Sequence, residues 1–495
     1  MLKTRYWKPL TAFLIGLLAV LIATYLLATP SQKDTAQSGQ QPVSTDQPLF
    51  SATLQTSYDS HCLSPTQADR PVWECYQIPT PGLFAHQAVQ VRHDSGKQYK
   101  VLTFEDQNQT VFRFTPTQKG TWTFSNGDQI DINRDRPAYA KGFVTAKGNK
   151  WIRSATDEAF VPQFVMYDKP DLDAGLNEFV DGHGFTGFHV INLRDFLKNP
   201  SYFEAVVLKT YRRGGTTHFW IWGDDYRKLT PSTYDVDVDL LYTEIAARLA
   251  PLPGWSLGYG FDLFEWSSAK EIENFRAQLR RNCSYHHLIG GRGHKSQYRE
   301  ISSKLDYAAW EWLKPSYTDY REHIEQANGR PAFSEDRFRI WPSKNRPNRA
   351  YDPELTFQGL WNSAMAGGVA NIWGHQPNKK QQFSAPYLNK AAIKTYSTVI
   401  NQSFTADMEP DNSLITSSPK DPPAYCLKDS GKQALCYAPQ TSSLQLNLES
   451  MELPIEAIAV DIRKAYEAIE LSILDPAFSW QAPYESGWAI MLHTR

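Results

Sequence analysis

Two acidic residues each follow a short apolar run that has the composition of a β-strand. Glu335 closes the run at residues 330–335, and Asp262 closes the run at residues 255–262. Glycoside hydrolysis uses two carboxyl groups, one as a nucleophile or base and the other as a proton donor. The two acids therefore predict cleavage of glycosidic bonds, with Glu335 and Asp262 as the catalytic pair. An acid after a strand also commonly caps the next helix, and that structural interpretation stays open.

Three further acids lie in comparable positions. Glu265, three residues after Asp262, competes with it as proton donor or belongs to the following loop or helix. Asp224 and Glu311 stand at predicted strand ends, where a carboxylate can accept hydrogen bonds from sugar hydroxyls. Ordinary solvated acids are the alternative for both.

Histidine and tryptophan residues complete the candidate site. His286 and His287 could orient substrate hydroxyls or a catalytic acid, and the indole of Trp373 could form the floor of a sugar subsite. Packing in the core is the alternative for Trp373. No third ligand stands near the two histidines at a recognisable metal-binding spacing, so we predict neither a metal nor another cofactor.

The middle of the chain alternates apolar strands with amphipathic helices. This pattern predicts an α/β fold with a (β/α)8 TIM barrel over residues 150–403, whose strand ends carry the acids. An open doubly wound sheet is the alternative, although no glycine-rich phosphate fingerprint follows the first strand. The predicted strands are 160–167, 187–193, 218–222, 255–261, 285–289, 305–310, 330–333 and 368–373.

The flanking segments have other patterns. Short alternating runs predict an N-terminal β-sandwich at residues 50–149 and a second β-domain at residues 404–495. Residues 30–49 are polar and predict a disordered tether.

The first 29 residues carry basic side chains followed by the uncharged apolar run 10–28. That length approaches the roughly 20 residues that span a bilayer, and the basic flank places the N-terminus in the cytoplasm. We expect a single-pass transmembrane signal anchor with the catalytic domain in the periplasm or outside the cell. A cleavable signal peptide is the alternative.

Composition narrows the partners. The formal charge is −2 and no long basic block is present, so nucleic acid is not a predicted partner. Fifteen tryptophans suit stacking on sugar rings, although core packing accounts for them equally well. Among five cysteines, Cys62 with Cys75 and Cys426 with Cys436 could close small loops, which leaves Cys283 as a buried thiol.

Several motifs resemble one known family. Residues 112–122, Phe-Arg-Phe-Thr-Pro-Thr-Gln-Lys-Gly-Thr-Trp, look like the signature of the β-sandwich that precedes apiosidase-like glycoside hydrolase barrels. Residues 258–263, 330–335 and 367–374 resemble the barrel itself. Proteins of this layout often end in a β-domain named for collagen binding. The resemblance implies that Asp262 is the acid/base and Glu335 the nucleophile.

The predicted function is that of an exported glycoside hydrolase acting on a complex or envelope polysaccharide by a two-carboxylate, retaining mechanism. A departure from the family pattern motivates the alternative. Related barrels carry Asn-Glu where this chain has Phe261-Asp262. A catalytically inactive carbohydrate-binding or envelope scaffold protein would tolerate that change.

Overall fold

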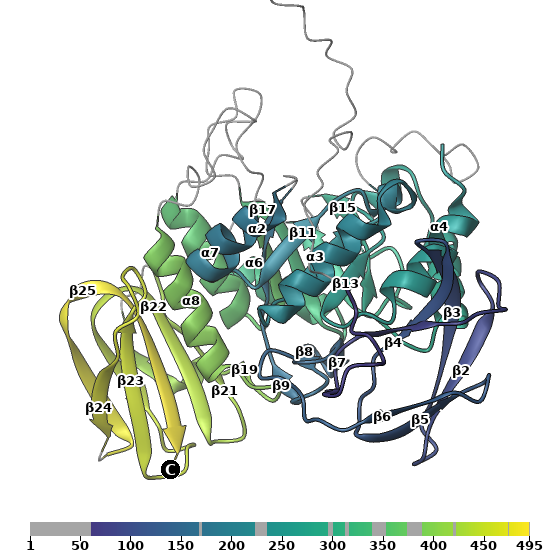
Figure 1. Cartoon of the computed structure of the whole chain (residues 1–495). Coiled ribbons are helices and arrows are strands. Elements are labelled where there is room, and N and C mark those ends of the chain that lie inside the picture. Colours follow the sequence, from purple (N-terminus) through teal and green to yellow (C-terminus); the bar gives the residue numbers. More distant parts are fainter. Residues whose placement is uncertain are drawn as a thin grey trace, which may run out of the picture. The chain divides into compact units, whose positions relative to one another are not determined.

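A computed structural model describes residues 61–494 except 168–170, 223–234, 296–299, 312–315, 339–352, 374–388, 419–421 and 474. These residues belong to one compact unit that begins at Thr56. Figure 1 shows a central α/β region between antiparallel sheets formed by the N-terminal and C-terminal segments.

The central region is a sheet of nine parallel strands. Its hydrogen-bonded order is β14-β13-β12-β11-β10-β18-β17-β16-β15. In chain order the strands are β10 (Gln163–Met166), β11 (Gly187–Val190), β12 (Thr217–Trp220), β13 (Trp255–Gly258), β14 (Ile289–Gly290), β15 (Arg292–Lys295), β16 (Ala308–Glu311), β17 (Ala332–Phe338) and β18 (Ala370–Trp373). Because all strands run in the same direction, their carboxyl ends meet on one side of the sheet.

The predicted closed barrel of eight strands is wrong. The strand expected at residues 285–289 begins later in the chain and is divided into two, β14 and β15. These two strands are the ends of the pairing order. Gly290 and Gly291 weaken a continuous strand here because they offer no side chain to pack. β14 pairs with β13, and β15 pairs with β16. Only Gly291 separates β14 from β15, so the ends of the order lie one residue apart in the chain.

Helices connect the parallel strands, and polar side chains fix where several of them begin. Asn199 accepts a hydrogen bond from the Tyr202 amide at the start of α3, and Ser268 does the same for the Glu271 amide in α5. The helices are α2 (Leu172–Gly175), α3 (Pro200–Arg212), α4 (Val238–Glu244), α5 (Ala269–Asn282), α6 (Tyr317–Gln326), α7 (Pro353–Met365) and α8 (Lys390–Ser403). Segments of π-helix are η1 (Leu176–Gly182) and η5 (Ile245–Leu249), and segments of 3₁₀-helix are η2 (Leu193–Lys198), η6 (Leu263–Glu265) and η8 (Asn412–Leu414).

The N-terminal segment forms antiparallel strands that pair in the order β1-β4-β3-β2-β5-β6. The sandwich predicted for residues 50–149 stays a prediction. The first half of the long strand β3 pairs with β2 and its second half with β4. The strands are β1 (Tyr76–Pro79), β2 (Ala88–His93), β3 (Gln98–Asp106), β4 (Gln109–Phe114), β5 (Gly120–Phe124) and β6 (Gln129–Ile132).

A small sheet of β7 (Val144–Lys147), β8 (Lys150–Arg153) and β9 (Glu158–Ala159) leads into the parallel strands. The C-terminal segment is a seven-stranded sheet in the order β19-β21-β22-β25-β23-β24, with β20 paired to β22. Its strands are β19 (Glu409–Pro410), β20 (Ile415–Ser417), β21 (Tyr425–Lys428), β22 (Gln433–Asn447), β23 (Ile455–Asp461), β24 (Ile469–Ile473) and β25 (Ala477–Thr494).

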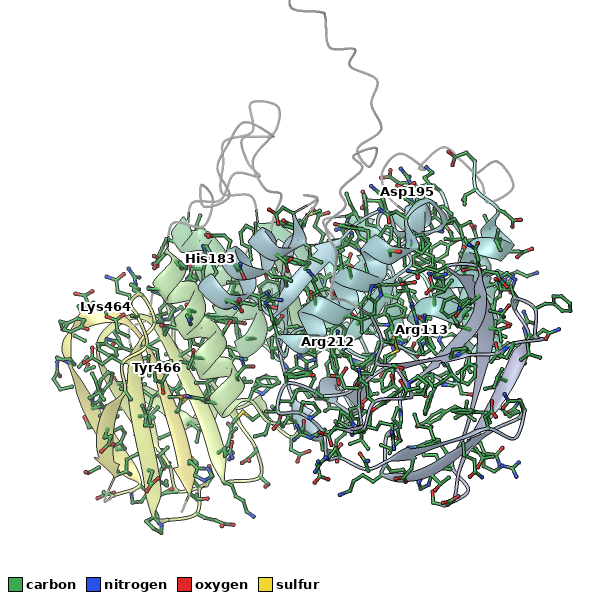
Figure 2. The ribbon with its side chains drawn as sticks, in the orientation of Figure 1. Arg113, His183, Asp195, Arg212, Lys464 and Tyr466 are labelled. Atoms are coloured by element: carbon green, nitrogen blue, oxygen red, sulfur yellow. A yellow bond between two sulfur atoms is a disulfide. The ribbon has the colours of Figure 1, made fainter. Side chains whose placement is uncertain are left out.

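The connection between β23 and β24 contacts helix α8. The Thr395 hydroxyl donates to the Lys464 carbonyl at 2.7 Å, and the Tyr466 hydroxyl donates to Gln402 at 2.8 Å. Figure 2 labels Lys464 and Tyr466 on this connection. These hydrogen bonds tie the C-terminal sheet to the last helix of the parallel region.

Both expected cysteine pairs form disulfides. Cys62 is bonded to Cys75, and Cys426 is bonded to Cys436 across the neighbouring strands β21 and β22. Disulfides are typical of proteins that fold in an oxidising compartment outside the cytoplasm. Cys283 is the buried free cysteine, and burial raises its pKa to about 12, so its thiol is unreactive.

The prediction of a membrane-anchored protein is wrong on the evidence of the described residues. None of their helices combines the length and the apolar character that crossing a membrane requires. The apolar run at residues 10–28 and the predicted tether at 30–49 lie outside the described residues.

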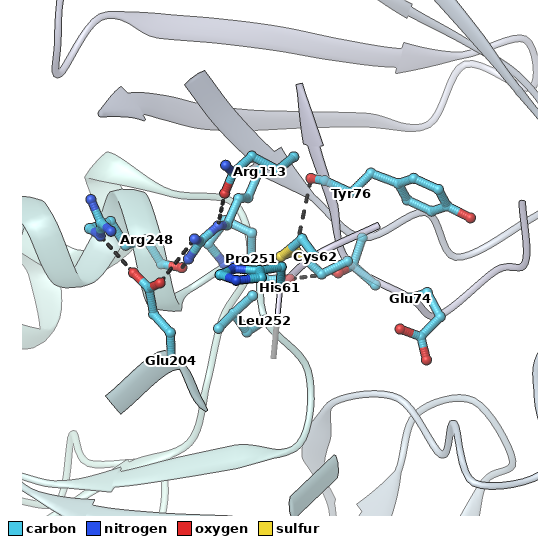
Figure 3. The surroundings of a disulfide bond; sticks show 12 residues. His61, Cys62, Glu74, Tyr76, Arg113, Glu204, Arg248, Pro251 and Leu252 are labelled. Carbon is cyan, nitrogen blue, oxygen red and sulfur yellow. Dashed lines mark hydrogen bonds and ion pairs between the residues drawn. A yellow bond between two sulfur atoms is a disulfide. The ribbon is translucent and has the colours of Figure 1, made fainter. Parts of the chain in front are cut away.

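A buried ion cluster joins the N-terminal sheet to the parallel region. Glu204 of α3 contacts Arg113 of β4 at 3.0 Å and Arg248 of η5 at 2.6 Å. Figure 3 shows Glu204 between the two guanidinium groups, next to the Cys62 disulfide. Burial alone would raise the pKa of Glu204, but the two arginines lower it below its ordinary value of 4.5.

We predict that Glu204→Gln costs about 3–5 kcal/mol of folding free energy at neutral pH, because it leaves buried arginine charge uncompensated. A lowered folded-state pKa stabilises the protein above the ordinary pKa, and this contribution is lost as pH falls. The difference from wild type should therefore shrink below about pH 4. Urea unfolding of both proteins at neutral pH and below about pH 4 measures this difference in unfolding free energy.

The control is Glu158→Gln, which removes a partly exposed ion pair with Lys141 and should cost about 1 kcal/mol or less. Equal losses in the two variants would contradict a stabilising role for the buried cluster.

Candidate active site

Three carboxylates, from β16, from β17 and from the loop after β13, surround one buried guanidinium. Arg292 Nη2 lies 3.2 Å from Asp262 Oδ1, and Nη1 lies 3.2 Å from Glu311 Oε2. Its Nε lies 3.9 Å from Glu335 Oε2. The four residues are at most 5% exposed. The structure thus brings both predicted catalytic acids and Glu311 together.

Strand register explains why these side chains meet. Trp310 of β16 is opposite Ser334 of β17, and the next residue on each strand is an acid, Glu311 and Glu335. Arg292 begins β15, the other neighbour of β16, and its amide donates to the Gly260 carbonyl at 3.2 Å. That bond brings Arg292 close to the loop that carries Asp262.

The loop after β13 turns sharply before Asp262. Gly260 has φ +158°, and a Cβ there would lie 2.8 Å from the Trp222 carbonyl oxygen. Asp262 itself adopts a left-handed conformation with φ 52°. Although it precedes the turn η6, its side chain makes no capping hydrogen bond to that turn. The carboxylate contacts Arg292, so the helix-cap interpretation does not hold for Asp262.

All three carboxylates share the Arg292 guanidinium as a partner. Burial alone would lower the pKa of Arg292, but Glu311, Asp262 and Glu335 raise it above its ordinary value. Arg292 therefore stays charged, and it partly offsets the cost of burying three acids in one place.

Trp220, the last residue of β12, also contacts the cluster. Its indole Nε1 donates to Glu335 Oε1 at 3.1 Å. The Arg292 guanidinium lies 5.7 Å from the centre of the Trp220 ring and 5.2 Å from that of Phe261. Gly258 leaves room for this indole, because a Cβ there would lie 2.6 Å from Trp220 Cδ1.

The predicted histidines lie away from this cluster. His287 is buried, and its ring nitrogens contact the Trp255 and Ala250 carbonyls, at and before the start of β13. His286 is exposed and shares these surroundings. Asp262 follows the opposite end of the same strand, so neither histidine joins the acids.

The other predicted residues are not placed in the cluster. Glu265 is exposed at the end of η6. Asp224 lies outside the described residues, as does the side chain of Trp373 at the end of β18. Among the described residues, no group of three or more His, Cys, Asp or Glu is arranged to hold a metal ion.

Sequence reasoning missed Arg292 and Trp220. Arg292 lies in Gly290-Gly-Arg-Gly293, and a cation flanked by glycines next to a strand was the available signal. Trp220 lies within a predicted strand, where a tryptophan is equally typical of the core.

Comparison with known proteins concerns mainly the fold. No protein-family model matches the chain, and no curated protein matches it in sequence. A solved structure of a "putative glycoside hydrolase" from Bacteroides vulgatus ATCC 8482 is similar with a TM-score of 0.64 and 12% identity, over 86% of this chain and 100% of that chain.

Two more solved structures are similar at a TM-score of 0.59. One is a glycoside hydrolase family 5 protein from Bacteroides vulgatus ATCC 8482, with 12% identity over 72% of this chain and 93% of its own. The other is named a glycoside hydrolase, with 11% identity over 72% and 98%. The chain therefore shares its fold with these proteins. The narrower resemblance to apiosidase-like barrels and collagen-binding domains stays a prediction.

We predict that Arg292→Met lowers the free energy of unfolding by about 3–5 kcal/mol at neutral pH, because three buried carboxylates lose the cation that they share. Urea unfolding monitored by tryptophan fluorescence measures the loss.

Arg213→Met is the matched control. Its ion pair with Asp181 is partly exposed and should contribute less than about 1 kcal/mol. An Arg292→Met variant no less stable than this control would show that the guanidinium does not stabilise the acid cluster.

Proposed function

We propose that this protein is a glycoside hydrolase that cleaves an oligo- or polysaccharide with Glu335 and Asp262 as its catalytic carboxyl groups. The observation that carries the proposal is the buried cluster of Asp262, Glu311 and Glu335 around Arg292. A fold shared with solved glycoside hydrolases supports it. The two disulfides support an exported protein.

Glu335 is the proposed nucleophile. A nucleophilic carboxylate must be ionised and correctly oriented, and hydrogen bonds from donors favour the charged form. The Trp220 indole donates to Glu335 Oε1, and Arg292 Nε lies 3.9 Å from Glu335 Oε2. In the first step Glu335 attacks the anomeric carbon, and the glycosidic bond to the leaving oxygen breaks.

Asp262 is the proposed acid/base. It protonates the leaving oxygen in the first step and takes a proton from the attacking water in the second, which releases the sugar from Glu335. Asp262 lies beside the same guanidinium as Glu335, and this supports the action of both acids on one glycosidic bond. We assign Glu311 to substrate binding, as an acceptor for sugar hydroxyls.

The position of Asp262 favours a second candidate function. Its carboxylate already contacts the Arg292 guanidinium at 3.2 Å. Phe261-Asp262 also stands where the barrels that the chain resembles carry Asn-Glu. A carbohydrate-binding protein without hydrolytic activity is therefore the alternative.

We predict that the full chain hydrolyses at least one member of a panel of 4-nitrophenyl glycosides and plant, algal and bacterial polysaccharides. Glu335→Gln and Asp262→Asn should each lose more than about a thousandfold in kcat/KM, because each removes a group that acts in the transition state. Released nitrophenol and reducing ends measure turnover. Asp181→Asn, an exposed acid, is the control.

The two roles are separable by substrate reactivity. Asp262→Asn should lose least on 2,4-dinitrophenyl glycosides, whose leaving group needs no proton, whereas Glu335→Gln should be inactive on all. Saturable glycan binding without product from wild type would favour the binding protein. Wild-type turnover in either variant would contradict the assigned pair.

A further inference from the structure

A chain of buried polar side chains lies beside the acid cluster, inside the parallel sheet. His189 Nδ1 of β11 lies 2.7 Å from His218 Nδ1 of β12. His218 Nε2 lies 2.9 Å from the Tyr307 hydroxyl, which donates to the Leu257 carbonyl of β13 at 2.9 Å. The three side chains are at most 1% exposed. Burying this many polar groups is costly, and hydrolysis as proposed above uses none of them.

The partners fix the direction of each hydrogen bond. A carbonyl only accepts, so the single Tyr307 hydroxyl proton points to Leu257, and the hydroxyl oxygen accepts from His218 Nε2–H. Burial lowers the pKa of His218 to about 3, so its ring is neutral and its Nδ1 is an acceptor. His189 Nδ1 must then carry a proton and donate it to His218. The chain therefore has one defined tautomer of each ring.

His189 connects this chain to the acid cluster. Its ring meets the Trp220 indole edge to face, with centroids 4.2 Å apart and planes at 81°. Trp220 in turn donates to Glu335 Oε1. Gly258 leaves room for the indole, because a Cβ there would lie 2.6 Å from Trp220 Cδ1, and the Phe261 ring packs against the indole with centroids 4.5 Å apart.

We propose that His189, His218 and Tyr307 are positioning residues that act through Trp220 to hold the Glu335 carboxylate in its reactive orientation. This inference rests on the proposed function, since it takes Glu335 as the nucleophile. The fixed tautomers define the His189 ring plane, that ring packs against the indole, and the indole N–H defines where one carboxylate oxygen lies. A nucleophile held in this way needs little reorganisation before it attacks.

The test uses the full chain and the 4-nitrophenyl glycoside that wild type hydrolyses fastest. Tyr307→Phe removes one hydroxyl and should lower kcat about 10- to 100-fold with KM changed less than about threefold, because the Glu335 orientation matters mainly in the transition state. Trp220→Phe should lower kcat at least as much. The double variant should be no slower than Trp220→Phe alone within about threefold, since both changes act on one group.

Tyr211→Phe is the matched control. Tyr211 is also a buried residue, and its hydroxyl donates to the Trp73 carbonyl and accepts from the Gly142 amide, neither of which contacts the acid cluster in the hydrogen bonds described above. Tyr211→Phe should lose as much stability as Tyr307→Phe but leave kcat unchanged. Equal kcat in Tyr307→Phe and Tyr211→Phe, or multiplying losses in the double variant, would overturn the inference.

A second measurement needs no substrate. In protein labelled with ¹⁵N-tryptophan, the Trp220 indole signal is assigned by its absence from Trp220→Phe. It should shift in Glu335→Gln and in Tyr307→Phe but not in Tyr211→Phe, and an unmoved signal in Tyr307→Phe would overturn the inference. Glu335→Gln also separates the two proposals: full turnover in it defeats the assigned mechanism, whereas an inactive Glu335→Gln beside a fully active Tyr307→Phe defeats only the positioning role.

Discussion

The arrangement of this site depends on one buried cation. Without Arg292, three carboxylates would share a volume from which water is excluded, and their mutual repulsion would oppose folding. Its guanidinium suits the task because it stays charged and offers several donors in one plane. All three acids contact this guanidinium, so side chains from different parts of the parallel sheet form one site.

Glycines next to the site leave room for neighbouring side chains. Gly290 and Gly291 interrupt the strand just before Arg292, and the Tyr307 ring fills the space where a Cβ at Gly290 would lie. Gly258 does the same for the Trp220 indole on the neighbouring strand. Glycine weakens a strand, so the sheet is less regular next to the site. The same break separates β14 from β15, which are the two ends of the pairing order.

The sequence was sufficient for the alternation of strands and helices and for placing acids on or just after strands at Asp262, Glu311 and Glu335, because both follow from local patterns. It was insufficient for closure of the sheet, which depends on pairing between distant segments, and for the length of β17, which continues past Glu335. Arg292 and the His189–His218–Tyr307 chain escaped detection for a related reason. Their hydrogen bonds join residues 29 to 89 positions apart in the chain, and no residue spacing signals such contacts.

The buried acids link stability to the proposed chemistry. Burying carboxylates costs free energy, and Arg292 offsets part of that cost in the free protein. Cleavage of a glycosidic bond passes through a transition state in which the sugar ring carries positive charge. Under the proposed function the carboxylates attract that charge as it develops, so the electrostatic stabilisation is greater in the transition state than in the bound substrate.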